Sequence, residues 1–460
     1  MKEFRTEEIE RTLLLLVEES LRRGASGADA IFDASRSSSL SLLDGEPEED
    51  GSGEDRSVGL RVIDGDGRQG VAATNDFDGK AISRLPEWCV RNCRVGDPDP
   101  WVRLLAHPFP GEPEAWGDLK LVDERIPVLT RQERFDACMR MTDAARSEPL
   151  RDGLRVCSVR SAAWSDWESV RCYASSTGVL IWSRATGVSV GTTVALDDGR
   201  TRSMGGYDGQ SHMLDGADPL LVAREAVRRT ARTHGGKAIA KGRYDLVLDA
   251  PVMADLLDVL GELFLASAVH RNQSFLGGRV GEMVAGPGVS LTDDGRLPGG
   301  MGTSAFDDEG VPTSRTVLLD RGRLTGFLYD LRNAAEDGVS STGNACRSAS
   351  STPDVATSNL MMTPGTRSRE ELLGALKRGI LVTELMGLHT VDPVSGDYSL
   401  GIRGVLLDGG EERLPVAGMT IAGTIPELLA GIDGAADDLT LRGDVGACTV
   451  VVRDVAVSGD

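Results

Sequence analysis

The sequence feature that most constrains the fold is a change of pattern at His234-Gly235-Gly236-Lys237. Before this point, predicted helices alternate with runs of extended structure; after it, the chain is rich in Gly, Asp and short apolar runs. Short apolar runs between turn residues are typical of many short strands. A chain of 460 residues is also long enough for more than one domain. We therefore expect an N-terminal domain over 1–235 and a C-terminal domain over 236–460.

The N-terminal half combines helix signals with strand signals. The apolar residues in 6–23 recur on one face, which predicts an amphipathic helix that ends at Gly24, a favourable C-cap. Thr130 and Glu133 have the spacing of a capping box, and Pro219 suits the first turn of another helix. The remaining expectations are a helix over 79–93, strands over 28–43, 58–62, 69–74, 156–163, 169–175, 179–184 and 188–196, an acidic mobile loop from Asp44 to Asp55, and a loop over 95–118.

In the C-terminal half, residues 244–248 indicate a short buried strand and residues 253–268 a helix. The expected fold class is α+β. The N-terminal domain should have helices packed on an antiparallel or mixed sheet, and the C-terminal domain should be rich in β-structure with a few helices.

Charge limits the possible partners. The chain has 50 basic and 71 acidic side chains, a net charge of −21. This charge opposes binding to nucleic acid, where Lys and Arg neutralise phosphate, and to an anionic membrane surface. One interpretation of the negative charge is that it keeps the protein soluble; the alternative is that it attracts basic peptides or a basic partner.

The compartment is predicted from the cysteines and the N-terminus. The seven cysteines are odd in number and form no compact disulfide framework, which indicates a reducing compartment. The N-terminus lacks the pattern of a signal peptide, and no stretch has the ~20 apolar residues of a membrane span. We expect a cytoplasmic protein.

Motifs for metal binding and nucleophilic catalysis are missing or weak. No two of the five histidines lie within two helical turns of each other, which excludes a two-histidine zinc motif on one helix. A zinc site built from distant residues stays open. The Cys89–Cys93 pair has no second pair or nearby His, so burial in a helix is expected. His270, which follows the predicted helix and precedes Ser274, is the one histidine in a suggestive place for a catalytic base.

The most informative stretch is 274–365. Its Asp307-Asp308-Glu309-Gly310 segment has ligands that suit calcium or magnesium, but it lacks the pattern of an EF-hand. A structural acidic turn is the main alternative. The other motifs are Gly278-Arg279-Val280-Gly281-Glu282, Val311-Pro312-Thr313, Arg315-Thr316, Ser341-Thr342-Gly343-Asn344-Ala345-Cys346-Arg347 and, further on, Ser395-Gly396-Asp397-Tyr398-Ser399 and Gly418-Met419-Thr420-Ile421-Ala422-Gly423.

In this order, the motifs resemble the TldD/TldE (PmbA) metallopeptidase family, in which a D-D-E-G-x-P-T segment precedes an S/P-T-G-N segment. The resemblance is good over 240–460 and weaker near Gly59-Leu60-Arg61-Val62. It implies a peptidase of two related chains. The TldD-like chain binds zinc through a helical His-Glu-x-x-x-His motif and a cysteine near the C-terminus, and the TldE-like chain lacks these ligands.

The resemblance places the zinc motif by counting back from Gly278 without gaps. The two histidines fall on Leu257 and Glu262, and the glutamate falls on Asp258. Cys448 aligns with a family proline downstream of the cysteine ligand and is not expected to bind metal. The resemblance therefore indicates the zinc-free, TldE/PmbA-type subunit, with no catalytic residue, metal ligand or cofactor of its own.

The expected function is that of a non-catalytic subunit which shapes the chamber for small unfolded peptides, such as a peptide natural product precursor. Its expected partner is a TldD-like chain that carries the zinc. Two alternatives stay open: a zinc-free hydrolase that uses His270 with Ser274 or an acidic pair, and an adaptor of the DNA gyrase modulator type. Candidate residues that line the chamber or fix loops at the subunit interface are Asp307, Glu309, Arg315, Ser341, Thr342, Asn344 and Arg347.

Overall fold

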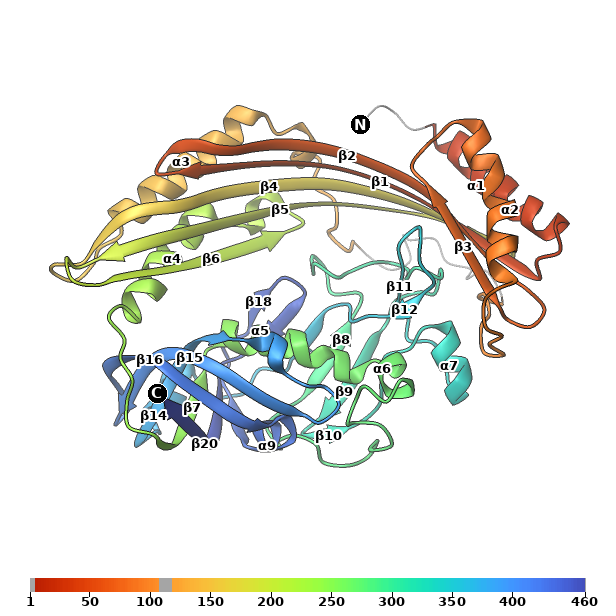
Figure 1. Ribbon diagram of the computed structural model, residues 1–460. Coiled ribbons are helices and arrows are strands. Elements are labelled where there is room, and N and C mark those ends of the chain that lie inside the picture. The colour runs from red at the N-terminus through yellow and green to blue at the C-terminus, as the bar shows by residue number, and fades with distance from the viewer. Residues whose placement is uncertain (1–4, 107–117, 460) are drawn as a thin grey trace.

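A long, curved sheet from the N-terminal half arches over a C-terminal body in the computed structural model (Figure 1). The structure describes residues 5–106 and 118–459, so part of the predicted 95–118 loop lies outside it. Helices and sheets are both extensive, which confirms the α+β fold class.

The arch is a six-stranded sheet in the order β3-β2-β1-β4-β5-β6, and all neighbouring strands are antiparallel. The extended segment predicted over 28–43 and the strands predicted over 58–62 and 69–74 are confirmed. The strands are β1 (Gly27–Leu43), β2 (Glu46–Ile63), β3 (Gln69–Thr74), β4 (Arg155–Ser175), β5 (Leu180–Asp197) and β6 (Arg202–Ser211).

One loop prediction and one set of strand predictions for the arch are wrong. The acidic segment from Asp44 to Asp55 is not a mobile loop, because β2 starts at Glu46 and pairs with β1 along its whole length. The four short strands predicted between 156 and 196 are two long strands, β4 and β5. Polar side chains interrupt the apolar pattern there, but the antiparallel backbone ladder continues past them.

Four helices cover one face of the arch: α1 (Thr6–Arg22), α2 (Gly79–Cys93), α3 (Arg131–Ser147) and α4 (Pro219–Arg232). Phe32 of β1 packs in the apolar cluster under α1 and α2, and Leu40 packs in the cluster under α3 and α4. Because side chains alternate along a strand, Phe32 and Leu40 lie on the same face. The capping box that starts α3 is confirmed, with both reciprocal hydrogen bonds formed.

The C-terminal body contains two further six-stranded sheets around a large apolar core. Their orders are β10-β9-β8-β13-β19-β18 and β16-β15-β14-β7-β20-β17. The strands are β7 (Gly242–Leu248), β8 (Leu291–Asp294), β9 (Arg315–Asp320), β10 (Arg323–Leu324), β13 (Leu360–Met362), β14 (Arg378–Met386), β15 (Asp397–Asp408), β16 (Glu411–Thr424), β17 (Ile432–Ala435), β18 (Thr440–Arg442), β19 (Val445–Ala447) and β20 (Val450–Gly459), with β11 (Ala345–Cys346) and β12 (Asp354–Val355) as a separate pair.

The helix predicted over 253–268 is broken in two. The first part, α5 (Ala250–Gly261), continues as a 3-10 turn over Glu262–Phe264, and α6 (Ala266–His270) starts after an extended Leu265. The break follows from pairing with another part of the chain. The N–H of Ala266 donates to the carbonyl of Leu328 at 3.0 Å, and the N–H of Leu328 donates to the carbonyl of Phe264 at 2.9 Å. The remaining helices are α7 (Leu331–Asp337), α8 (Arg369–Gly374) and α9 (Ile425–Ala430).

Within the described ranges, no helix is both long and apolar enough to cross a membrane.

Candidate functional site

The Asp307–Gly310 segment forms a tight turn that is fixed by its own carboxylate. Asp307 accepts backbone hydrogen bonds from Glu309 and Val311 at 2.9 Å and from Ala345 at 3.0 Å. Gly310 has a φ of +79°, a conformation that side chains with a Cβ rarely adopt. The turn is therefore held against the 344–347 segment.

Glu309 belongs to a buried cluster of charged side chains between the arch and the C-terminal body. The Asp29 carboxylate accepts a hydrogen bond from Arg61 Nε at 3.0 Å, and Arg347 Nη2 lies 2.6 Å from Asp29 Oδ1. Arg61 Nη2 also lies 3.5 Å from Glu309 Oε1. The four side chains are at most 2% exposed. We call Asp29, Arg61, Glu309 and Arg347 the charge cluster.

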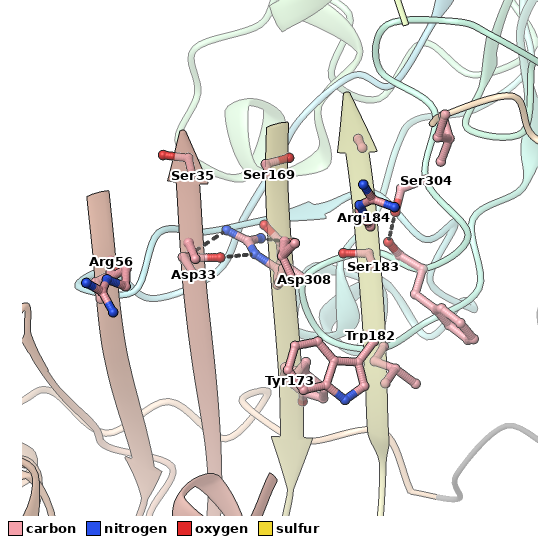
Figure 2. Close-up of a pocket in the computed structure, with 18 of the residues that line it drawn as sticks. Asp33, Ser35, Arg56, Ser169, Tyr173, Trp182, Ser183, Arg184, Ser304 and Asp308 are labelled. Carbon is pink, nitrogen blue, oxygen red and sulfur yellow. Dashed lines mark hydrogen bonds and ion pairs between the residues drawn. The ribbon is translucent and has the colours of Figure 1, made fainter. Parts of the chain in front are cut away.

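A second ion-pair chain borders the charge cluster. Arg171 of β4 pairs with Asp33 of β1 at 2.6 Å and with Asp308 of the acidic turn. Asp308 in turn accepts the backbone N–H of Arg347 at 2.7 Å. Asp33 and Asp308 project toward the same region of the sheet surface in Figure 2. The acidic turn is thus joined to the arch by two carboxylates: Asp308, which pairs with Arg171, and Glu309, which lies near Arg61.

The two carboxyls of the charge cluster have opposite pKa shifts. Burial alone would raise the pKa of Asp29, but the guanidinium groups of Arg347 and Arg61 outweigh it and lower the pKa. Burial raises the pKa of Glu309 to about 7, against the attraction of Arg61, and Asp330 and Asp29 add to the rise. Burial and the neighbouring Glu309 also raise the pKa of Asp307. The cluster therefore holds a firmly ionised carboxylate beside one that titrates near neutral pH.

Two cavities adjoin this region. One, of about 610 Å³, is lined by residues of β1, β2, β4 and β5 and of the 303–308 segment, as Figure 2 shows. The other, of about 670 Å³, is lined by Arg61, Glu309 and Arg347 together with residues of α6 and α7. Both volumes lie in the range of small-ligand sites, about 300–1,000 Å³. Each cavity takes its lining from both the arch and the C-terminal body.

Four of the predicted candidates, Arg315, Ser341, Thr342 and Asn344, do not line either cavity. Arg315 is exposed and lies 4.0 Å from a carboxylate oxygen of Asp294. The hydroxyl of Ser341 donates to the carbonyl of Tyr329 at 3.0 Å, and Thr342 donates to Asn344 at 2.7 Å. The contacts of Ser341, Thr342 and Asn344 hold the loop that presents Arg347.

Asn344 also contacts a perturbed carboxyl group. Its side-chain amide donates to Asp293 Oδ2 at 2.8 Å. Burial raises the pKa of Asp293 to about 6, although hydrogen bonds from Asn344 and from the Ser358 backbone lower it. Asp293 is thus a further buried carboxyl group with a raised pKa in the C-terminal body, besides Glu309 and Asp307.

The positions of the degenerate zinc motif do not fit a zinc ion. Leu257 on α5 is 4% exposed, packs in the main apolar core and has no donor atom. Asp258 and Glu262 are exposed. Cys448 is buried, which raises the pKa of its thiol to about 12 and disfavours the thiolate that binds metal. In residues 5–106 and 118–459, no three His, Cys, Asp or Glu side chains group as a metal site.

His270 has acidic neighbours rather than the serine considered as its partner. Its Nε2 lies 2.9 Å from Asp337, and its Nδ1 lies 3.1 Å from Glu336. The Ser274 hydroxyl donates instead to the carbonyl of Leu263 at 2.7 Å. The structure therefore brings His270 to an acidic pair at the edge of the second cavity, and gives Ser274 a structural hydrogen bond.

Sequence reasoning missed the residues that the arch contributes: Asp29, Arg61, Arg171 and Tyr173. Tyr173 donates to Asp29 across 3.5 Å. The available signal was the position of Asp29 and Arg61 inside apolar strand segments, because Asp and Arg are almost never fully buried unless they are paired. The sequence does not show which residues pair with them.

Three family models match the chain in succession. The PmbA/TldA metallopeptidase domain 1 matches residues 28–92, the central domain matches 124–233, and the C-terminal domain matches 241–459.

Relatives with curated descriptions match over nearly the whole chain. The metalloprotease PmbA of Escherichia coli O157:H7 is 25% identical over 95% of this chain and 93% of its own length. A metalloprotease TldD homologue of Haemophilus influenzae is 27% identical over 95% of this chain and 91% of its own length.

Solved structures share the fold. A Thermotoga maritima protein, described as a candidate modulator of a DNA gyrase, has a TM-score of 0.87 at 24% identity, covering 98% of this chain and 100% of that one. TldE from Thermococcus kodakarensis has a TM-score of 0.82 at 20% identity, covering 97% of this chain and 100% of that one. With the three family models and the full-length relatives, these likenesses lead to one conclusion: the chain belongs to the PmbA/TldD metallopeptidase family.

Proposed function

We propose that this chain is a non-catalytic, TldE/PmbA-type subunit of a zinc metallopeptidase heterodimer. The observation that supports the proposal is Leu257, which packs in the core where the resemblance places a zinc-binding imidazole. A catalytic zinc needs three protein ligands and an open position for the attacking water. A leucine cannot supply a ligand, and moving it out would open the apolar core.

In this proposal, a TldD-like partner carries the zinc and the general base. This chain supplies part of the wall of the substrate chamber, and the substrates are small unfolded peptides in the cytoplasm. The two cavities support a binding role, because they combine several hydroxyl groups with charged side chains that are already paired. Paired charges can orient a peptide without binding one particular sequence.

The direct test compares the isolated chain with its complex with a TldD-like partner. Zinc content and cleavage of an unfolded peptide are measured for both. We expect zinc and peptide cleavage in the complex and neither in the isolated chain. Stoichiometric zinc together with cleavage in the isolated chain would contradict the proposal.

His270→Ala separates this proposal from the zinc-free hydrolase. The substitution should leave cleavage by the complex nearly unchanged, because His270 contacts Asp337 and Glu336 rather than a nucleophile. Loss of all cleavage with the complex still assembled would favour the hydrolase.

A matched pair of serine variants tests the chamber role. Ser35 on β1 is exposed and lines the 610 Å³ cavity, whereas Ser52 on β2 is exposed and does not line it. Ser35→Trp should fill part of the cavity and lower cleavage by the complex, without loss of assembly. Ser52→Trp should leave cleavage unchanged, and equal effects of the two variants would argue against a role of this cavity.

A further inference from the structure

The arch and the C-terminal body have separate apolar cores. Among the described residues, three of the five clusters of buried apolar side chains contain only residues before 233, and two contain only residues after 241. Ion pairs link the two halves, among them Arg61–Glu309, Arg332–Asp99 and Arg442–Asp208. An interface without a shared apolar core allows relative motion of the parts that it joins.

The covalent connection between the halves lies at one end of the arch. Residues 233–241 lead from α4 to β7, and Lys237 exchanges backbone hydrogen bonds with the 415–417 segment at 3.1 and 3.2 Å. Nearby, Arg229 of α4 pairs with Asp249 at 3.1 Å. Figure 1 shows this connection on the side of α4, away from α2 and α7. Contacts so close to a pivot need only small adjustments when the halves rotate.

The opposite end of the arch is held by the charge cluster. Arg61 and Asp29 come from the arch, and Glu309 and Arg347 come from the C-terminal body. Arg171–Asp308 and Arg332–Asp99, the latter at 2.9 Å, reinforce the same end. Two polar contacts also join the halves elsewhere in the described chain. The N–H of Gly299 donates to the carbonyl of Leu119 at 2.8 Å, and Arg442 of β18 pairs with Asp208 of β6 at 3.1 Å.

We infer that the arch is a lid that swings about residues 233–241, and that the charge cluster is the latch that holds it closed. Both cavities are lined from both halves, so this rotation opens them together. The inference concerns a motion of this chain alone. It does not depend on the proposed role in a peptidase.

The energetics of the cluster suit a latch. Removing one partner of a buried ion pair leaves a charge without compensation, so the closed state depends on all the partners at once. In an open state the same groups regain water, which lowers the cost of separation. An apolar interface of similar extent would expose its surface to water on opening and would resist the motion more strongly.

The length of the arch makes the motion measurable. A strand of 21 residues such as β4 spans about 70 Å at ~3.3 Å per residue. A rotation of about 10° at one end therefore displaces the other end by roughly 12 Å. A displacement of this size is well within the range of distance measurements between spin labels.

The experiment places spin labels at Val95→Cys, after α2, and at Val339→Cys, after α7. Both positions are exposed, and the exposed cysteines Cys157 and Cys346 are replaced by serine. In full-length protein, pulsed electron resonance gives the distance distribution for the otherwise unchanged chain, for Arg347→Gln, and for the control Arg232→Gln. Arg232 pairs with Glu412 near the pivot.

The unchanged chain and the control should give the same short distance. Arg347→Gln should add a population that is longer by roughly 10 Å, as expected from the length of the arch. Arg332→Gln removes the partly exposed ion pair with Asp99 at the same end and should add a smaller population at the longer distance. This variant replaces Arg347→Gln in the test if Arg347→Gln does not fold. Unchanged distances in folded Arg347→Gln, or in Arg332→Gln where that variant alone folds, would overturn the inference.

Discussion

Replacing Glu309 by Gln removes a charge without changing the size of the side chain. The Glu309 carboxyl faces Arg61, Asp330, Asp29 and the backbone N–H of Leu331, and Asp307 lies in the same turn. Its pKa is raised from 4.5 to about 7. Glu309 loses its proton at a lower pH in the unfolded chain than in the folded chain. Between pH 4.5 and about pH 7 the folded chain therefore binds more protons, and its stability falls as the pH rises.

The size of this effect follows from the shift. A difference of about 2.5 pKa units, at 1.36 kcal/mol per unit, corresponds to roughly 3 kcal/mol of unfolding free energy. Wild type should lose most of this amount between pH 5 and pH 8 through Glu309. Glu309→Gln should lack this loss and should be at least as stable as wild type at pH 8.

Urea denaturation at pH 5 and pH 8, followed by tryptophan fluorescence, measures the difference. Asp293, whose pKa is raised to about 6, titrates in the same range but is present in both proteins, so its contribution cancels. Parallel pH dependences of wild type and Glu309→Gln would refute the reasoning. A large destabilisation of Glu309→Gln at pH 8 alone would show that the ionised form stabilises the cluster.

Three further substitutions have defined outcomes. Leu257→Ala should lower the unfolding free energy by about 2–5 kcal/mol in urea denaturation, because it opens a cavity in the main core. Thr130→Ala removes the N-cap of α3 and should cost about 1 kcal/mol, seen as a lower thermal midpoint. Gly59→Ala would place a Cβ 1.9 Å from the carbonyl oxygen of Ala349, so we expect a cost of about 1–3 kcal/mol and weaker protection of the β2 amides from hydrogen exchange.

Much of the N-terminal fold could be predicted because its signals are local. Thr130 as a capping residue and Pro219 as a first-turn residue mark helix starts within one turn of sequence, and both helices begin there. The long strands could not be predicted in full. Their polar residues match sheet partners that are distant in sequence, so the ladder continues where the apolar alternation stops.

The site was predictable on one side only. The motif around Asp307 and the motif around Arg347 are each a continuous stretch of sequence, so a resemblance to a family can identify them. Their partners are not contiguous: Arg61 reaches Glu309 across 248 positions. Nothing in the local sequence of β2 encodes that contact, because it depends on how the arch is placed over the C-terminal body.

The packing of Leu257 has a consequence for what a metal site at this position would require. A single change to histidine would put an imidazole among apolar side chains and leave a buried polar group unpaired, at a cost of about 1–3 kcal/mol. It would supply one ligand, too few to hold zinc. A first step toward a metal site at this position is therefore unfavourable without a compensating gain, so the packing of the core itself opposes zinc ligands there.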